Sequence, residues 1–204
     1  MNPASTAFSP VSARNNPFVV QRTDAIPFDF RDTPFDGMDD FFDHVSRSQF
    51  RGAIVGKHGR GKTTLLCDLN RALKDRNMDC ELLFIPRNRA EQGELLGGST
   101  EKGRRGTILL VDGIERLPFL RRQQLISESK RFAGFIATTH RRGRLPTLLR
   151  CQTSVETLMS ILKSLGTNSQ QTQSAARALL STHRGNIRSV LRDLYDGFAS
   201  GESR

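Results

Sequence analysis

The sequence predicts an α/β fold in three layers, with a parallel five-stranded sheet and a small C-terminal helical lid. From residue 50 onward, short apolar segments alternate with longer amphipathic ones. Such alternation is typical of a parallel sheet that is covered by helices on both faces. After residue 153 the apolar residues recur only at helical spacing, which predicts three short helices over 155–165, 170–182 and 187–198.

The predicted strands are short and apolar. They cover 53–55, 82–85, 107–111 and 135–137, with 148–151 as the fifth. Between them, the spacing of the apolar residues predicts helices over 62–74 and 118–131. A Gly-rich loop is expected over 93–106, between the second and third strands.

Three domains are expected: an N-terminal extension over 1–49, the α/β core over 50–152 and the helical lid over 153–204. The extension starts with the polar residues 1–16, which we predict to be disordered. Three Pro-Phe pairs follow. Because proline keeps the preceding residue extended, we expect this stretch to pack across the surface of the core. A short helix is predicted over 37–47.

Composition limits the classes of protein that fit. Apolar runs are only four to six residues long, whereas a helix needs about 20 apolar residues to span a bilayer, so we expect no membrane segment. The first residues do not have the pattern of a signal peptide. The three cysteines are isolated from one another, which favours neither a zinc site nor a disulfide framework. A cytoplasmic location fits these features best.

The charge is distributed unevenly along the chain. Residues 1–50 hold four Arg and seven Asp, a net charge of −3, while the remaining 27 basic and 14 acidic residues give +13. A surface of this kind attracts polyanions, and nucleic acid is one candidate partner. Basic surfaces also keep proteins soluble, so the charge alone does not require a nucleic acid. No segment resembles a helix-turn-helix or another dedicated DNA-reading element, and a protein partner or a homo-oligomer is therefore the alternative.

The strongest motif is a phosphate-binding loop (P-loop, or Walker A) between the first strand and the first helix of the core. It fits G-x-x-x-x-G-K-[ST] at every fixed position, in the order Gly56, Lys57, His58, Gly59, Arg60, Gly61, Lys62 and Thr63. Glycines let successive backbone N–H groups point at the phosphates, and the helix N-terminus favours the same anion. Lys62 is expected to reach the β- and γ-phosphates and Thr63 to bind magnesium, and we add Thr64 to the nucleotide-binding residues.

A carboxylate follows the third predicted strand. In P-loop proteins an Asp at this place holds the magnesium ion, which assigns Asp112 to the metal. The sequence spacing suggests that this strand lies beside the strand of the phosphate loop. Gly113 occupies the place where many P-loop ATPases have a catalytic Glu. Glu115 is the alternative catalytic carboxylate, or a residue that only favours the start of the next helix.

Together these segments resemble the AAA+ ATPase family, in the group of initiator and clamp-loader proteins. The resemblance covers residues 50–200 and implies ATP and Mg²⁺ as cofactors. It also implies a polar residue at the end of the fourth strand that contacts the γ-phosphate (sensor 1), with Thr139 the first choice and Thr138 the second. Gly185-Asn186-Ile187-Arg188 is similar to the lid motif in which an arginine reaches the γ-phosphate, which implies that role for Arg188 (sensor 2).

Other P-loop classes fit less well. The sequence has no guanine-reading Asn-Lys-x-Asp segment, and Leu96 to Ser99 stands too close to Asp112 for the signature of a transporter ATPase. A small-molecule kinase and a non-hydrolysing ATP switch remain as alternatives. We therefore expect an ATP-binding protein, an AAA+-like ATPase in which the bound nucleotide controls movement of the lid and binding of a partner.

Overall fold

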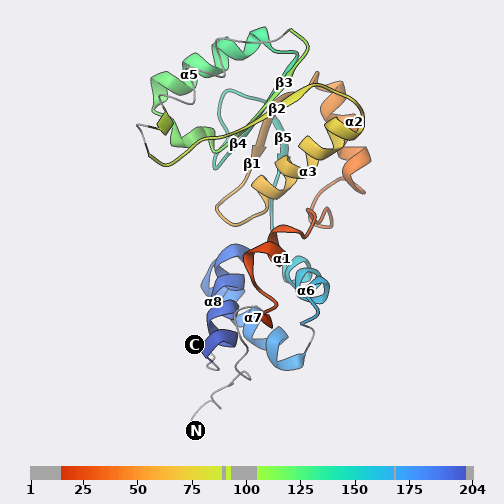
Figure 1. Cartoon of the computed structure of the whole chain (residues 1–204), viewed down its shortest axis with the longest axis vertical. Coiled ribbons are helices and arrows are strands. Elements are labelled where there is room, and N and C mark those ends of the chain that lie inside the picture. The colour runs from red at the N-terminus through yellow and green to blue at the C-terminus, as the bar shows by residue number, and fades with distance from the viewer. Residues whose placement is uncertain (1–14, 89–90, 93–104, 168, 201–204) are drawn as a thin grey trace. The chain divides into compact units, whose positions relative to one another are not determined.

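The computed structural model describes residues 15–88, 91–92, 105–167 and 169–200 (Figure 1). Most of the segment predicted to be disordered, 1–16, and most of the predicted Gly-rich loop therefore lie outside the described residues, as does Leu96 to Ser99. The chain divides into two compact units. The α/β unit comprises Thr33–Lys57 and Gly61–Cys151, and the helical unit comprises the chain up to Asp32, His58–Arg60 and the chain from Gln152 onward.

The α/β unit contains one five-stranded sheet in which all paired strands are parallel. Its strands are β1 (Arg51–Val55), β2 (Cys80–Phe84), β3 (Ile108–Asp112), β4 (Gly134–Thr139) and β5 (Thr147–Arg150). β1, β3 and β4, in the middle of the sheet, are largely buried, as expected for a sheet that is covered on both faces. The edge strands β2 and β5 are only partly buried. The structure thus confirms the α/β class and the parallel five-stranded sheet.

The strand order is β2-β3-β4-β1-β5. Our expectation that the strand of the phosphate loop lies beside the acidic strand is therefore wrong, because β4 lies between β1 and β3. Sequence spacing shows how many elements separate two strands along the chain, but not which strands pair. The consequence is that the end of β4 lies between the loop that follows β1 and the carboxylate that ends β3.

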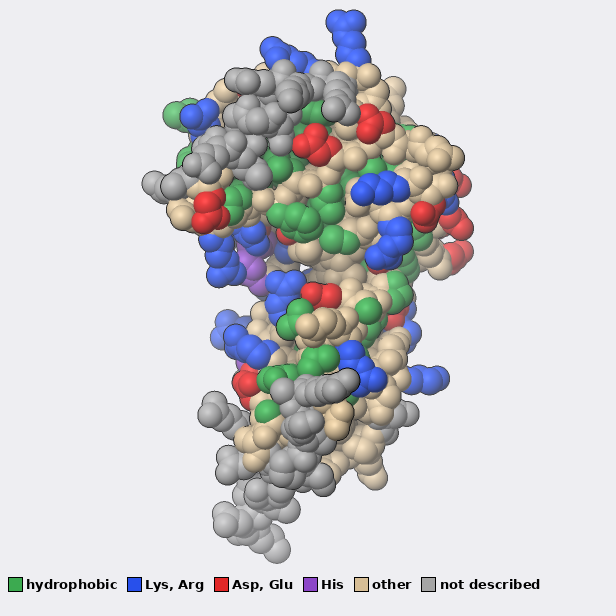
Figure 2. Space-filling model, in the orientation of Figure 1, with side chains coloured by type: hydrophobic (Ala, Val, Ile, Leu, Met, Phe, Trp, Pro, Cys, Tyr) green, Lys and Arg blue, Asp and Glu red, His purple; other side chains and the backbone are tan. Residues whose placement is uncertain are grey.

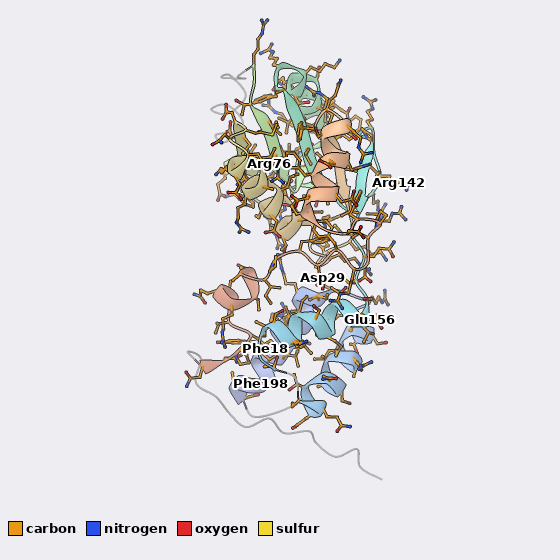
Figure 3. The ribbon with its side chains drawn as sticks, turned by 90° about the vertical axis from the view of Figure 1, so that its right-hand side faces the viewer. Phe18, Asp29, Arg76, Arg142, Glu156 and Phe198 are labelled. Carbon is orange, nitrogen blue, oxygen red and sulfur yellow. The ribbon has the colours of Figure 1, made fainter. Side chains whose placement is uncertain are left out.

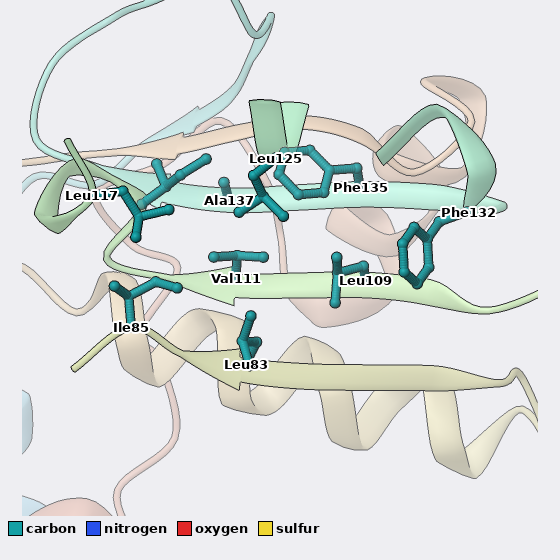
Figure 4. Packing of buried hydrophobic residues seen from close by; sticks show 10 residues of the cluster. Leu83, Ile85, Leu109, Val111, Leu117, Leu125, Phe132, Phe135 and Ala137 are labelled. Atoms are coloured by element: carbon teal, nitrogen blue, oxygen red, sulfur yellow. The ribbon is translucent and has the colours of Figure 1, made fainter. Parts of the chain in front are cut away.

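Helices occupy both faces of this sheet. α3 (Lys62–Asp75) follows β1 and packs against the sheet through leucines that are fully buried. On the other face, α5 (Phe119–Glu128) contributes Leu125 to an apolar cluster with side chains of β2, β3 and β4, which Figure 4 shows with α3 behind the strands. The 3₁₀ turns η2 (Ile114–Arg116) and η3 (Ser129–Arg131) precede and follow α5.

α2 (Met38–Arg47) leads into β1 and belongs to the same unit. Phe41 and Val45 face the interior and are fully buried. Phe35, from one of the Pro-Phe pairs, packs edge-on against Phe41 with ring centroids 5.2 Å apart. At this point the Pro-Phe segment therefore lies on the α/β core.

The helical unit is built from α6 (Val155–Ser164), α7 (Gln170–Thr182), α8 (Ile187–Ser200) and the short α1 (Val20–Asp24). Ser154 and Ser169 cap α6 and α7 by accepting hydrogen bonds from the third backbone N–H. Phe18 is buried in the core of this unit and packs against Phe198 of α8, both labelled in Figure 3. Asn16 anchors the segment by donating to the carbonyl of Tyr195.

Among the described residues, none of the helices combines the length and the apolar character that crossing a membrane requires.

Candidate functional site

The side chains singled out in the core follow the carboxyl ends of three adjacent strands. β3 ends at Asp112, β4 at Thr139 and β1 at Val55, and the phosphate loop starts at Gly56. In an open parallel sheet, ligands bind outside the carboxyl ends of the strands, where neighbouring connections run in different directions. The connection from β1 leads towards β2 at one edge, whereas that from β4 leads to β5 at the other.

The backbone of the phosphate loop depends on its glycines. Gly59 has a φ of +67° and Gly61 a φ of +78°, in the left-handed region that residues with a side chain rarely adopt. Gly61 is also the N-cap residue of α3, and no side chain in the described part of the chain caps this helix. The first turn of an α-helix leaves N–H groups without intrahelical partners. The start of α3 therefore offers donors and the positive end of the helix dipole to an anion.

The lysine of the motif folds back over the loop. Lys62 is the first residue of α3 and only 8% exposed, and its Nζ donates to the carbonyl oxygen of Lys57 over 2.9 Å. The side chains of Lys57 and His58 point to the surface. Of the loop's cations, Lys62 is thus the one whose ammonium group lies against the loop backbone.

Cys151 lies directly after β5 and packs against the beginning of the loop. A Cβ added to Gly56 would lie 3.0 Å from the carbonyl oxygen of Cys151, so a larger residue at Gly56 would press on that backbone. Burial raises the pKa of the Cys151 thiol to about 12, against an opposing effect of the Lys62 charge. Cys151 therefore stays a neutral thiol and is a packing residue.

The central three residues of the loop, 58–60, belong to the helical unit, where they contact the start of α8. The Ile187 N–H donates to the Gly59 carbonyl oxygen over 3.2 Å, and Nη2 of Arg60 donates to the carbonyl of Arg184 over 3.0 Å. A Cβ at Gly59 would stand 1.7 Å from Oδ1 of Asn186. The side chain of Arg188, in the first turn of α8, is exposed.

Three oxygen-bearing side chains converge on the end of β3. Oγ1 of Thr63 lies 3.2 and 3.1 Å from the two carboxylate oxygens of Asp112, which is 5% exposed. Thr138 donates to Oδ1 of Asp112 over 2.7 Å and accepts a hydrogen bond from the N–H of Gly113. A hydroxyl and a carboxylate are hard oxygen ligands of the kind that Mg²⁺ takes alongside phosphate oxygens. The side chains present therefore fit that ion.

The two threonines at the end of β4 face different ways. Thr138 is buried against Asp112, whereas the hydroxyl of Thr139 donates to the carbonyl oxygen of Arg141 over 3.2 Å and shapes the following loop. Thr139 was the first choice for sensor 1, but it is Thr138 that the structure brings to the carboxylate. Side chains alternate along a strand, and the pairing of Val111 with Ala137 puts Thr138, the next residue of β4, beside Asp112, the next residue of β3.

A second polar pair lies beside this group. Gly113 has a φ of +79°, and the η2 turn that follows carries Glu115 back towards the end of β4. There Oε1 of Glu115 lies 2.8 Å from Nε2 of His140. The other oxygen, Oε2, is buried and has no hydrogen-bond partner within the described parts of the chain. Such an acceptor is typically satisfied by a water molecule or a ligand.

His140 is the residue of this group that the sequence did not identify. Its one signal was its place directly after Thr138 and Thr139 at the end of a strand. Its pairing with Glu115 depends on the contact between the ends of β3 and β4, which residue spacing does not reveal.

In comparisons with known proteins, no family model matches this chain, and no curated protein matches it significantly.

Proposed function

We propose that this protein binds ATP together with Mg²⁺ and hydrolyses the nucleotide in the manner of an AAA+ ATPase, coupling its state to the helical unit. The observation that carries the proposal is the contact between Thr63 and Asp112. It joins the last residue of the phosphate-loop motif to the acidic strand, although β4 separates the two strands. Thr63 and Asp112, the two residues that we expect to bind the magnesium ion of the nucleotide, are thus in contact.

In this proposal the backbone N–H groups between Gly56 and Thr64 hold the phosphates, and Lys62 moves from the carbonyl of Lys57 to the β- and γ-phosphates. Thr63 binds Mg²⁺, and Asp112 supports the ion directly or through water. An ion held there would supply positive charge against the negative charge that develops on the phosphates. Thr138 fixes the orientation of Asp112 through its 2.7 Å hydrogen bond.

Many P-loop ATPases carry a catalytic Glu directly after the metal-binding Asp, where this chain has Gly113. In our proposal Glu115 supplies that carboxylate. Its buried Oε2 is an acceptor that can orient a water molecule for attack. The other oxygen is held by His140. Thr139 is the second choice for the γ-phosphate contact, because its hydroxyl already donates to the carbonyl oxygen of Arg141 in the following loop.

Arg188 is proposed to contact the γ-phosphate from the helical unit. Its backbone lies next to Gly59, because a Cβ on Gly59 would be 3.3 Å from the Arg188 nitrogen. If it acts in this way, Arg188→Ala weakens binding of ATP and leaves binding of ADP largely intact. Equal losses for both nucleotides would contradict this role.

Calorimetry with MgATP tests the proposal directly. We expect Lys62→Ala to abolish binding, because the buried ammonium that completes the phosphate cage is lost. Lys74→Ala is the matched control, since Lys74 is an exposed lysine in the last turn of the same helix. Unchanged ATP affinity in the Lys62 variant would end the assignment.

A non-hydrolysing ATP switch is the second candidate, and the glycine at position 113, in place of a catalytic Glu, favours it. Phosphate release over many turnovers separates the two, because a switch binds ATP without consuming it. Turnover that depends on a small phosphoryl acceptor would instead identify a kinase. Adding nucleic acid to the same assay tests it as a partner, and sedimentation tests self-association.

A further inference from the structure

Two large apolar side chains stand in solvent at the start of α5. Phe119 is 60% exposed and Leu120 is 79% exposed, directly after Pro118. The helix is held to the sheet by other residues, above all by Leu125, which is 2% exposed. Single exposed apolar residues are common on proteins, so the meaning of this pair depends on its surroundings.

The surroundings are strongly basic. Between residues 119 and 150 the chain holds eight Lys and Arg and a single acidic residue, Glu128. Arg121 is exposed next to the apolar pair, and the guanidinium carbon of Arg122 lies 5.9 Å from the centre of the Phe119 ring. In Figure 2, drawn in the orientation of Figure 1, blue and green side chains lie next to each other where α5 is drawn.

The loop between β4 and β5 adds further arginines to this side of the unit. Arg141, Arg142 and Arg144 are all exposed, and Figure 3 labels Arg142. The loop is fixed to α5, because Nη1 of Arg144 donates to Oε1 of Gln123 over 2.7 Å. Next to it, Leu145 packs against the cluster that contains Leu125. The basic loop and the start of α5 therefore form one surface, which we call the arginine surface.

We propose that the arginine surface, formed by Phe119 to Arg122 and Arg141 to Arg144, binds single-stranded nucleic acid. Exposed arginines pair with backbone phosphates and stack on bases. An exposed aromatic ring within a basic groove or face offers a stacking platform to any base, because every base has a planar face. The combination of a ring with arginines on both segments matches this ligand.

Other polyanions fit the surface less well. An acidic peptide satisfies the guanidinium groups but has no row of planar groups to cover the Phe119 ring. In a duplex the base faces are stacked on each other, so phosphate contacts alone remain. Neither explains why a phenyl ring and a leucine stand exposed among the arginines.

The proposal goes beyond the ATPase function and does not rest on it. The loop of the arginine surface starts directly after His140, the partner of Glu115. Nucleic acid bound there would therefore lie beside the candidate nucleotide site, within the same α/β unit.

Fluorescence anisotropy on the full chain tests the proposal, with a fluorescein-labelled oligothymidylate of about 20 nucleotides, longer than one single-strand site. We expect Phe119→Ala to weaken binding by about 5- to 160-fold, the range for loss of one stacked base. Phe119→Leu, which keeps an apolar side chain without a ring, should weaken it as well. Circular dichroism confirms that the variants remain folded.

The arginines are tested by salt dependence. The double variant Arg141→Gln with Arg142→Gln should lower the slope of log K against log salt by about 1.4, because about 0.7 counterions are released per phosphate contact on a single strand. The charge-matched control is Arg71→Gln with Lys74→Gln, two exposed residues of α3, and should leave the slope unchanged.

Three results would overturn the proposal. They are wild-type affinity in both Phe119 variants, an equal loss in the α3 control, and binding of polyglutamate or a blunt duplex as tight as that of the single strand. The last result would assign the surface to acidic peptides or to duplex nucleic acid.

Discussion

Thr138 and Asp112, near the ends of neighbouring strands, are joined by a buried hydrogen bond of 2.7 Å from the threonine hydroxyl to Oδ1. The same hydroxyl accepts the Gly113 N–H. One side chain therefore fixes both the carboxylate and the backbone turn that follows it. Thr63 contacts the same carboxylate. Thr138 of β4 therefore orients the carboxylate group that contacts Thr63 at the start of α3.

We predict that Thr138→Val destabilises the protein. Valine has nearly the same shape but leaves the buried N–H of Gly113 and one oxygen of Asp112 without this partner, which costs about 1–3 kcal/mol. Urea denaturation measures the change. Thr139→Val is the control, since the bond from its hydroxyl to the carbonyl of Arg141 lies at the surface. Equal losses in the two variants would contradict the assigned role of Thr138.

Gly59→Ala should destabilise the helical unit. The new Cβ would lie 1.7 Å from Oδ1 of Asn186, and the residue would have to adopt a φ of +67°. A positive φ alone costs alanine about 1 kcal/mol relative to glycine. Displacement of Oδ1 of Asn186, which accepts the N–H of Ser189 in the first turn of α8 over 3.2 Å, adds to this cost. Gly143→Ala is the control, because none of the described residues lies within 4 Å of its Cβ position. Thermal unfolding compares the two.

We expect Glu115→Gln to lower ATP turnover by about 10²- to 10⁴-fold, the usual contribution of a general base, while MgATP affinity is kept. Gln keeps the shape and one acceptor but cannot take a proton. Glu128→Gln, a change of the same kind on α5, should leave turnover unchanged. If the Glu115 variant hydrolyses ATP at the wild-type rate, another group activates the water.

The Cys151 thiol should resist alkylation. Burial raises its pKa to about 12, and because the thiolate is the reactive form, almost none of it is present at pH 8. We expect maleimide to leave Cys151 unmodified in the native protein and to modify it after denaturation. Peptide mass spectrometry identifies the site, and rapid native labelling of Cys151 would show that its packing against Gly56 opens.

Local signals in the sequence were sufficient for the strands and the long helices. The turn from β1 into α3 was predictable as well, because its glycines are adjacent in the sequence; that this turn binds phosphate stays a prediction. Features that depend on strand pairing were not predictable. The place of β4 between β1 and β3, and with it the choice of Thr138 over Thr139 as the neighbour of Asp112, follows from register. The pairing of His140 with Glu115 has the same origin.

Aromatic residues of the N-terminal segment show the same limit. Phe18 and Phe35 both follow proline, and from the sequence both were expected to pack on the α/β core. In the structure, Phe18 packs against Phe198 in the helical unit and Phe35 against Phe41 in the α/β unit. The partner of each ring depends on surfaces that are distant in sequence.

The position of β1 in the sheet has a consequence for how the protein opens. β1 is hydrogen-bonded by β4 on one side and β5 on the other, whereas β2 and β5 are the edges. An edge strand can fray by breaking one ladder, while β1 is released only if two are lost. Amide protons of Ala53 to Val55 should thus exchange with deuterium more slowly than those of the edge strands. The strand that precedes the phosphate loop then stays in the sheet while β2 and β5 open locally.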